Sequence, residues 1–596
     1  MRYRFLLLLL FASTLLPAQR DLLPVGPSAE ERAMQQWYQF IAPAKSRGIE
    51  EPPPHPVRHM AEWEELQALS ITWRTSPSYM PVLLTQIAKH ASEEVPVVVF
   101  CNTQNVLNQA TSTLQNAGVD LDKIQFSIVP NNSIWIRDYG PNCVYANDVE
   151  ELYFVDWIYN RPTRPLDDVL PDGAGAHFGV PVYSTTQTPH DLVHTGGNFM
   201  SDGLGTGFAS KLTLLENGTG PQNVYNAGPH TADDIDAILN TFMGIDRFVK
   251  MDILPYDGIH HIDMHMRLLD EETLLVGEYP QGIADGPQIE ANLQYVLDNY
   301  STAFGTPYKV VRIVQPPDGN GNYPNQGGAY RTYTNSVLVN KTVLVPTYEE
   351  KYDTTALRIY RENMPGYKVV GINCNSIIQL SGALHCVTKE IGVGDPLWIV
   401  HKSLEDIHDN ELWSSYEVTA QIKHKSGIAE AHVYYTTDTL AGYEAVPLSL
   451  VDPDAGTWAG TIPHQENGST IFYYIHAEAN SGKKQVRPLA APSGYFRFRV
   501  DGMPVSTSET TTIAVRPLYP NPASAITVIP VASSTHQPAS IEVVDVLGRR
   551  VEVVFRGDLP AGESNYYLHA NRLAPGSYFV VVKTNEAVMT QKLVVK

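Results

Sequence analysis

The sequence predicts an α/β region followed by two β modules, and three observations lead to this prediction. Short apolar runs alternate with helix-like segments between about residues 51 and 395, which is typical of α/β domains. Beyond residue 395 the helical pattern fades, and short alternating runs separated by turn residues indicate strands. The chain has 596 residues, too many for one hydrophobic core, so several domains are expected.

The first 18 residues, MRYRFLLLLLFASTLLPA, have the pattern of a secretory signal peptide. Two arginines precede an apolar stretch that is too short to span a bilayer as a mature helix, and cleavage is expected after Ala18. Residues 19–50 are polar and lead into the run EEPPPHP. Consecutive prolines oppose helix and ladder bonding, so we interpret this part as a pro-segment or linker. We therefore expect a protein that acts outside the cytoplasm.

The region from residue 51 to residue 395 combines strand-like runs with helix-like segments. VPVVVF, KIQFSIVP and YKVVRIV are of the first kind, and MPVLLTQIAKHAS is of the second. Strand–strand–helix units recur here without a glycine-rich nucleotide loop. The pattern therefore favours a pseudo-symmetric, propeller-like arrangement over a Rossmann sheet.

Two β modules follow, residues 396–501 and residues 517–596, and a linker over residues 502–516 joins them. The first alternates in hydrophobicity, as in STIFYYIHAEANSGKK, which predicts an Ig-like β-sandwich. The second carries YPNP, VLGR, GSYFV and KLVV, in an order that resembles the C-terminal sorting domain of Bacteroidetes proteins exported by the type IX system. One more adhesive β-sandwich is the alternative. The resemblance implies a secreted or cell-surface protein, with the type IX secretion machinery as a partner.

Charge and cysteine content narrow the functional classes. The formal net charge of −22 disfavours nucleic acid and anionic membranes as partners. No later segment approaches the roughly 20 apolar residues of a transmembrane helix. Four cysteines without a CxxC pair exclude a disulfide-dense scaffold and allow at most one or two bridges. They are Cys101, Cys143, Cys374 and Cys386.

Cys386 lies in the stretch SGALHCVT, directly after a histidine. It could be a buried small hydrophobe, half of a disulfide, or a nucleophile. Three other stretches bear on this choice. NNSIWIRDYGPN places Asp138 at a predicted strand end beside Trp135, and HTGGNFMSDG has paired glycines that allow close backbone approach. In GIHHIDMHMRLLD, His261 and Asp263 are two residues apart and would share one face of a strand.

A metal site is the alternative reading of the last stretch. Its candidate ligands would be His260, His261, Asp263 and His265. Only three of these four share a strand face, and the chain has no spaced partner cluster of the zinc type. We therefore predict no metal.

One thiol, one imidazole and two carboxylates suit chemistry on a guanidinium group. This group is planar and permanently charged, so paired carboxylates can accept its N–H bonds while a thiolate adds to its central carbon. A histidine can then protonate the departing amine and later activate water. A cysteine peptidase needs an oxyanion hole instead and has no use for two substrate carboxylates. The set favours guanidine chemistry.

The motifs WIRDYGP, TGGNFMSDG, HHIDMHM, YTNSVLVN and GALHCVT occur in the order seen in guanidino-group-modifying enzymes. The chain resembles the family of agmatine deiminases and Porphyromonas-type peptidylarginine deiminases over about residues 55–390. The resemblance implies a five-bladed pseudo-symmetric α/β propeller, the pentein fold, and no cofactor. It also implies roles for six residues: Cys386 as nucleophile, His261 as acid–base, Asp138 and Asp263 as guanidinium ligands, and Trp135 and Asn335 as pocket residues.

Two features bear on the branch of the family. Agmatine deiminases are similar to one another in a glutamate before the glycine pair, whereas this chain has the stretch His194-Thr195-Gly196-Gly197, which resembles the peptidylarginine branch apart from His194. FVDWIYNRPTRPLDD resembles the segment through which the peptidylarginine branch receives a substrate's C-terminal carboxylate. Arg161 matches that pattern, Arg164 is displaced by one residue, and Asp156 of the same segment is also expected to bind substrate. A surface loop with solvated arginines is the alternative.

The sequence thus predicts a secreted cysteine hydrolase that converts arginine, at peptide C-termini, to citrulline and ammonia through a covalent thiouronium intermediate. The expected partners are an arginine-containing peptide or small guanidine substrate and the secretion machinery. A secreted agmatine or free-arginine deiminase is the second reading. A surface adhesin with an inactive propeller is the third, and the joint retention of all four catalytic residues argues against it.

Overall fold

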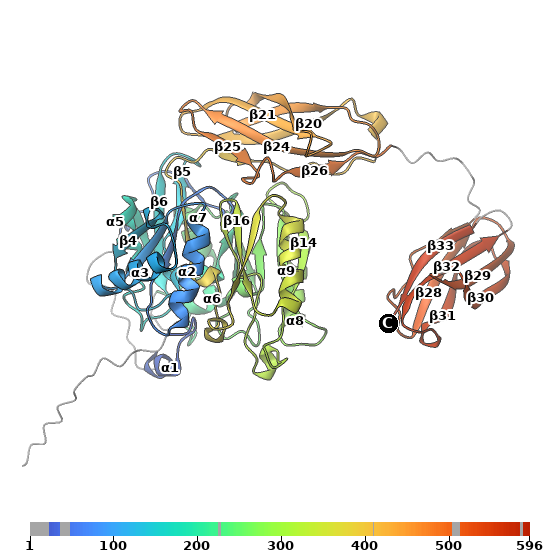
Figure 1. Cartoon of the computed structure of the whole chain (residues 1–596), viewed down its shortest axis with the longest axis horizontal. Helices are drawn as coiled ribbons and strands as arrows, with labels where there is room; N and C mark the ends of the chain where they lie inside the picture. Colours follow the sequence, from blue (N-terminus) through green and yellow to red (C-terminus); the bar gives the residue numbers. More distant parts are fainter. Residues whose placement is uncertain are drawn as a thin grey trace, which may run out of the picture. The chain divides into compact units, whose positions relative to one another are not determined.

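The computed structural model describes residues 23–35, 48–223, 228–408, 410–502, 513–546, 548–584 and 588–596. The predicted signal peptide and most of the predicted linker at 502–516 lie outside these residues. The chain divides into two compact units, Met1–Asp501 and Gly502–Lys596 (Figure 1). Within the described residues, no helix combines the length and apolar character needed to cross a membrane.

Five separate sheets build the α/β region in the described part of the first unit. We call this region the catalytic domain, after its predicted role. The first sheet contains β1 Val57–His59, β5 Asn142–Ala146, β6 Leu152–Tyr159, β7 Val182–Thr185 and β8 Val193–His194. The second sheet contains β9 Met200–Ser201, β10 Thr206–Ser210 and β11 Arg247–Met251. The third sheet contains β12 Met266–Leu268, β13 Thr273–Glu278 and β14 Lys309–Val314. The fourth contains β15 Val337–Val339, β16 Thr342–Thr347 and β17 Lys368–Asn373. The fifth contains β18 Lys389–Gly392, β2 Leu66–Thr72, β3 Val97–Cys101 and β4 Ile124–Ile128.

The same local pattern recurs in all five sheets. In each sheet one strand pairs antiparallel with a second, and a helical crossover then returns the chain to a third strand parallel to the second. In the first sheet β1 adds to the outer side of this pattern by pairing with β5. The helices are α1 Ala29–Gln35, α2 Tyr79–Ala91, α3 Gln104–Asn116, α5 Leu170–Phe178, α6 Leu212–Asn217, α7 Ala232–Met243, α8 Gly286–Asn299 and α9 Glu350–Asn363. The α/β class predicted for this region is confirmed.

Local sequence explains where these elements begin and end. The run VVVFC of β3 is buried at every position, as expected for a strand covered on both faces. Helix α7 begins with a capping box between Thr231 and Asp234 and ends at Gly244 in the left-handed conformation. The last sheet joins distant parts of the chain, because β18 pairs antiparallel with β2. This pairing closes the domain and brings the Cys386 stretch beside its N-terminal part.

Among the described residues at the end of the first unit, eight strands form the β region. They are β19 Trp398–Val400, β20 Ser415–Lys423, β21 Ile428–Thr436, β22 Glu444–Asp452, β23 Thr457–Pro463, β24 Thr470–Ala479, β25 Lys484–Arg487 and β26 Phe496–Arg499. Alternate residues of β24 are buried, so one face of this strand covers a core. Figure 1 shows this β region across one end of the catalytic domain and α1 at the opposite end.

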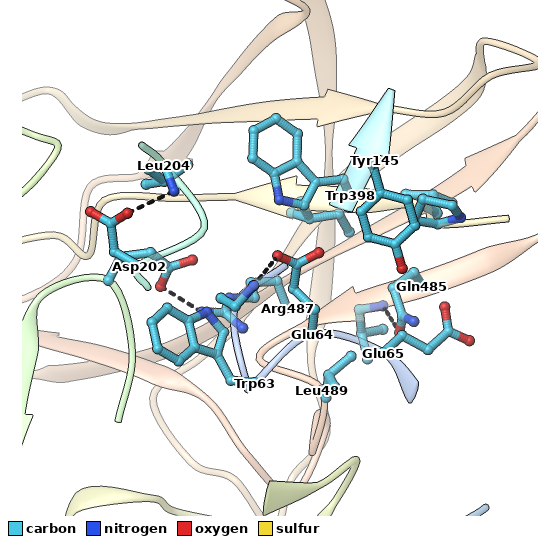
Figure 2. A pocket seen from close by; sticks show the side chains of 16 residues that line it. Trp63, Glu64, Glu65, Tyr145, Asp202, Leu204, Trp398, Gln485, Arg487 and Leu489 are labelled. Atoms are coloured by element: carbon cyan, nitrogen blue, oxygen red, sulfur yellow. Dashed lines mark hydrogen bonds and ion pairs between the residues drawn. The ribbon is translucent and has the colours of Figure 1, made fainter. Parts of the chain in front are cut away.

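The β region packs closely on the catalytic domain. Trp398 and Val400 are buried with Val149, and Arg487 forms an ion pair with Glu271. A cavity of about 30 Å³ lies at this junction (Figure 2). Trp398 and Arg487 reach it from the β region, and Trp63, Tyr145 and Asp202 from the catalytic domain.

The second unit consists of two sheets around a core of its own. Its strands are β27 Ile513–Val515, β28 Ile526–Ser533, β29 Gln537–Asp545, β30 Arg550–Leu559, β31 Gly562–His569, β32 Gly576–Thr584 and β33 Val588–Val595. The β-rich character predicted for the C-terminal part of the chain is confirmed.

Candidate active site

The structure brings Asp138, His261, Asp263 and Cys386 together in the interior of the catalytic domain. Three of them are fully buried, and Asp263 is 5% exposed. The Cys386 Sγ atom lies 3.7 Å from Asp263 Oδ2. His261 Nδ1 lies 3.6 Å from Asp138 Oδ1. Residues separated by almost 250 positions thus form one cluster, which we call the catalytic quartet after the role predicted for it.

Each part of the site lies directly before the strand that starts the recurring antiparallel pair of its sheet. Quartet residues lie in or beside three short helical turns: α4 Ile136–Tyr139 before β5, η3 Ile262–Met264 before β12, and η6 His385–Val387 before β18. Asn335 precedes β15 in the same way, and the glycine pair in η2 Gly196–Asn198 precedes β9. Equivalent places in five sheets therefore supply the residues of one site.

The local structure around three of the quartet residues corrects the sequence prediction. Asp138 does not end a strand but lies in the single turn of α4. His261 and Asp263 do not lie on one strand, because residues 262–264 form a 3-10 turn that leads into β12. The alternation in this stretch resembles a strand, but the chain turns at His260, whose φ is +58°. The two side chains still reach the same site.

Asn335 holds the cysteine in place from both ends of its amide. Its Oδ1 accepts hydrogen bonds from the backbone N–H groups of Ala383 (3.2 Å) and His385 (3.1 Å). Its Nδ2 donates to Cys386 Sγ at 3.2 Å. A donor aimed at sulfur stabilises a thiolate, so Asn335 both orients Cys386 and favours its reactive form.

Two glycines make room for the quartet. A Cβ atom at Gly197 would lie 2.4 Å from His261 Nδ1 and 3.0 Å from Asp138 Oδ1. A Cβ atom at Gly382 would lie 2.6 Å from Trp135 and 3.1 Å from Cys386 Cβ. Neither position can carry a side chain without moving a member of the site. The close backbone approach expected at the glycine pair is present.

The quartet is prepared for a cation. Asp138 Oδ2 and Asp263 Oδ1 are buried without a hydrogen-bond partner, which is costly unless a ligand supplies one. Burial and then the Asp263 carboxylate raise the pKa of Asp138 to about 6. Burial and the same two carboxylates raise the pKa of the Cys386 thiol. Burial and the neighbouring Arg161 hold the pKa of His261 well below its usual value. A guanidinium would satisfy both free oxygens.

His385, the residue before Cys386, links Asp263 to Glu62. Its Nδ1 is 2.8 Å from Asp263 Oδ2, and its Nε2 is 2.8 Å from Glu62 Oε1. Burial opposes protonation, yet the two carboxylates outweigh it and raise the pKa of His385. A protonated His385 donates to both carboxylates, so it fixes the Oδ2 side of Asp263 and leaves Oδ1 for a ligand.

A buried charge network surrounds this link. Glu62, His385 and Glu390 lie close enough to hold a metal ion together. Arg137 already pairs with Glu390 at 2.5 Å, and Arg267 pairs with Glu62 at 2.7 Å. These cations balance the carboxylates, so we interpret the group as a structural network and not as a cation site.

The residues predicted to bind substrate lie as follows. Trp135 is fully buried beside the quartet, and its Nε1 donates to the carbonyl of Leu23. Arg161 and Arg164 are buried, which excludes the alternative of solvated surface arginines. Asp156 is buried in β6 next to Trp157, whose Nε1 donates to the Asp138 carbonyl. Successive side chains of a strand point to opposite faces, so Asp156 is on the other face of β6 from Trp157.

Sequence reasoning missed three contributors to the site. His385 had a visible signal, its position beside Cys386, but no role was assigned to it. Glu62 and the segment beginning at Leu23 had no signal in the sequence, since their contacts join residues far apart in the chain. All four cysteines are free and buried, so no disulfide competes with a nucleophilic role.

The site combines a buried thiol, a neutral imidazole and two carboxylates with free oxygens, and it lies among five mixed sheets. This combination of fold and site is that of enzymes that act on guanidino groups. The chain belongs to the Porphyromonas-type peptidyl-arginine deiminase family, whose sequence model matches residues 58–391. It is therefore a deiminase of the hydrolase class that acts on guanidino groups. A second family model, the secretion system C-terminal sorting domain, matches residues 517–596. The sorting domain indicates export to the cell surface or the medium.

Known relatives agree with this assignment. Two proteins named "Putative agmatine deiminase" match, from Lactococcus lactis and Legionella pneumophila strain Paris. The first is 25% identical over 53% of this chain and 88% of its own length, and the second is 24% identical over 51% and 84%. A structure of the agmatine deiminase of Enterococcus faecalis is 22% identical with a TM-score of 0.50, over 58% of this chain and 99% of that one. The last likeness concerns the fold alone.

Proposed function

We propose that this protein deiminates arginine at peptide C-termini, producing citrulline and ammonia, with Cys386 as the covalent nucleophile. The observation that carries the proposal is the pair of partnerless carboxylate oxygens on Asp138 and Asp263 beside the Cys386 sulfur. A planar guanidinium placed between them would receive two charge-assisted hydrogen-bond acceptors and bring its central carbon to the thiol.

The proposed reaction begins when the guanidinium enters. Its positive charge offsets the two carboxylates, lowers the pKa of the Cys386 thiol, and favours proton transfer to the neutral His261. The thiolate adds to the guanidinium carbon. His261 then returns the proton to the departing nitrogen, ammonia leaves, and an S-alkylthiouronium remains on the cysteine. A water molecule deprotonated by His261 displaces the sulfur and gives citrulline, so arginine and water become citrulline and ammonia.

The proposal includes the five-bladed propeller. Five sheets contain the same strand–strand–helix–strand order, and each supplies a site residue just before the strand that starts this order, which supports five pseudo-equivalent blades. Pairing of β18 with β2 would then close the ring. We also propose the domain limits 51–395, 396–501 and 517–596, with an Ig-like sandwich in the middle one.

The residues before the glycine pair favour a peptide substrate over agmatine. The resemblance to agmatine deiminases would place a glutamate directly before Gly196, where this chain has the uncharged Thr195. The preceding residue, His194, is a buried imidazole stacked on Trp157 with ring centroids 4.6 Å apart. Burial lowers the pKa of His194 to about 3, so the side chain is neutral and offers no negative charge to a substrate amine. The names of the relatives favour an agmatine deiminase, which we keep as the second candidate.

One assay tests the choice between these candidates. Citrulline release is measured with a peptide ending in arginine, the same peptide extended past its arginine, free arginine, and agmatine. We expect the first substrate to be the best. If agmatine is turned over best, the second candidate replaces the first.

Replacing Arg161 with alanine should lower the preference for a C-terminal arginine peptide over agmatine. A hydrogen bond to a charged group contributes about 1.5–3 kcal/mol, roughly ten- to a hundredfold in relative kcat/KM. Agmatine has no carboxylate, so its turnover is the internal reference. Arg358→Ala, on the exposed face of α9, is the matched control. An unchanged substrate ratio in Arg161→Ala would remove this residue from carboxylate recognition.

Deleting residues 517–596 should leave the activity of the purified enzyme unchanged but retain the protein inside the producing cell. The second unit has a core of its own, and all quartet residues lie in the first. Cell fractionation and a citrulline assay of the soluble protein check both parts. Surface delivery of the shortened chain would contradict the sorting role, and loss of activity would show that this unit supports the catalytic domain.

A further inference from the structure

Three of the residues expected to bind substrate, Trp135, Arg161 and Arg164, donate hydrogen bonds to an N-terminal segment of the same chain, residues 23–31. Trp135 Nε1 donates to the Leu23 carbonyl at 2.8 Å, and Arg161 Nε donates to the Val25 carbonyl at 3.0 Å. Arg164 Nη2 reaches the carbonyls of Pro24 (2.8 Å) and Gly26 (3.0 Å). The segment therefore uses the donors that a substrate peptide would need.

Val25 carries the segment to the nucleophile. It is fully buried, and its N–H donates to the Leu380 carbonyl at 2.9 Å, in the stretch that leads to Cys386. A Cβ atom at Gly382 would lie 2.7 Å from Val25 Cγ2 and 3.1 Å from Cys386 Cβ. Val25 and Cys386 thus both border the small space that a side chain at Gly382 would fill. Cys386 and His261 are inaccessible to solvent with the segment in place.

Glu31 anchors the segment with a carboxylate. Its Oε1 accepts from Arg164 Nε (2.8 Å) and from the Thr163 hydroxyl (2.8 Å), and its Oε2 accepts from Arg164 Nη2 at 2.9 Å. Ser28 N–H also donates to Oε2, at 2.7 Å. This is the forked arrangement by which arginine binds a carboxylate. Glu31 is only 6% exposed.

We propose that residues 23–31 are an intramolecular inhibitor, so that the chain is latent until this segment is displaced or cut away. The segment is tethered beside the site, and its effective concentration there exceeds that of a free substrate. Glu31 occupies the position of the substrate carboxylate, and Val25 blocks the approach to Cys386. The proposal concerns regulation of the site described above and rests on the proposed function for the nature of the competing ligand.

Two readouts test latency separately from deimination. The first is alkylation of Cys386 by iodoacetamide, located by peptide mass spectrometry, which needs no substrate turnover. Cys101, Cys143 and Cys374 of the same chain are buried and give the background rate. The second is citrulline release. Both are measured on the full chain with a site-specific protease sequence placed between residues 40 and 45, before and after cutting and removal of the fragment.

Cutting is expected to raise the Cys386 alkylation rate at least about tenfold and to start citrulline release. Glu31→Gln in the uncut chain should raise the alkylation rate about ten- to a hundredfold, because the charge-assisted bonds to Arg164 are lost. Glu30→Gln changes the exposed neighbour in the same way and should match the unsubstituted chain. A synthetic peptide of residues 23–35 should inhibit the cut enzyme, and its Glu31→Gln version should need about tenfold more.

The outcomes separate the two proposals. Equal alkylation and equal citrulline release before and after cutting would overturn the latency proposal while leaving deimination intact. Faster alkylation without citrulline release from any of the four substrates would support latency and overturn the proposed function. If Glu31→Gln does not fold, the cut protein and the added peptide still decide.

Discussion

The Cys386→Ala enzyme is expected to release no measurable citrulline, with kcat lowered at least about 10⁴-fold, as is typical when the nucleophile of a covalent mechanism is removed. The other quartet members cannot replace it. Two are carboxylates committed to the cation, and the third is an imidazole whose role is proton transfer. Without a thiolate, no bond to the guanidinium carbon forms.

The fold should survive this change. Replacing the thiol by a methyl hydrogen removes one buried sulfur and its contact with Asn335, which should cost on the order of 1 kcal/mol. The melting temperature of the catalytic domain checks this. The assay uses protein from which residues 23–35 have been cut, so that latency cannot hide the loss.

Cys374→Ala is the matched control. Cys374 is another buried free cysteine of the same domain, its thiol donates to the Ile372 carbonyl, and burial raises its pKa. It lies outside the quartet, so this variant should keep its activity. Wild-type turnover by Cys386→Ala would contradict the mechanism, and an equal loss in both variants would indicate a general packing effect.

Much of the site was predictable from sequence because each motif has a local signature. Asp138 lies in WIRDYGP, Asp263 in HHID and Cys386 in ALHC, and each stretch leads into a short buried strand. The repeat behind them was visible as a recurring order of strands and helices but not as a repeat of residues, since each sheet contributes a different residue type at the equivalent place. Similar backbones with dissimilar residues leave no self-similarity in a single sequence.

The rest of the site depends on long-range contacts. Glu62 meets His385 more than 300 residues along the chain, and nothing in VRHMAEWEE distinguishes this glutamate from its neighbours. The segment at residues 23–31 is polar with prolines, which describes a linker equally well. Its placement comes from Val25 and Glu31 finding partners on distant loops. Local propensity does not report such pairings.

Asp138→Asn is expected to lower kcat/KM at least about 10³-fold and at the same time to stabilise the catalytic domain above pH 6. The amide keeps the shape of the carboxyl, and its oxygen can still accept from the Gly197 N–H, now at 3.1 Å from Oδ1. It has no charge for the guanidinium, and its NH₂ group cannot accept a hydrogen bond. Asp263→Asn should behave alike in activity.

The stability effect follows from the raised pKa. Asp138 titrates near 3.8 when unfolded and at about 6 in the folded protein, so the carboxyl's contribution to stability is fully present below pH 3.8 and lost as the pH rises through 6. Above that pH the buried anion opposes folding by about 2–3 kcal/mol, at 1.36 kcal/mol for each unit of pKa shift. Asparagine does not ionise and avoids this cost.

The melting temperature of Asp138→Asn should therefore exceed that of the parent enzyme at pH 7.5, and the difference should vanish toward pH 4. Asp202→Asn is the matched control: Asp202 is 1% exposed and burial also raises its pKa, but it lies at the junction with the β region and caps the backbone of Leu204 and Thr206. The kcat/KM of the Asp202→Asn enzyme should not change. A stable Asp138→Asn enzyme with unchanged kcat/KM would place the guanidinium elsewhere, whereas lost activity with a gain in stability identifies a carboxylate that is kept for its ligand at the expense of the fold.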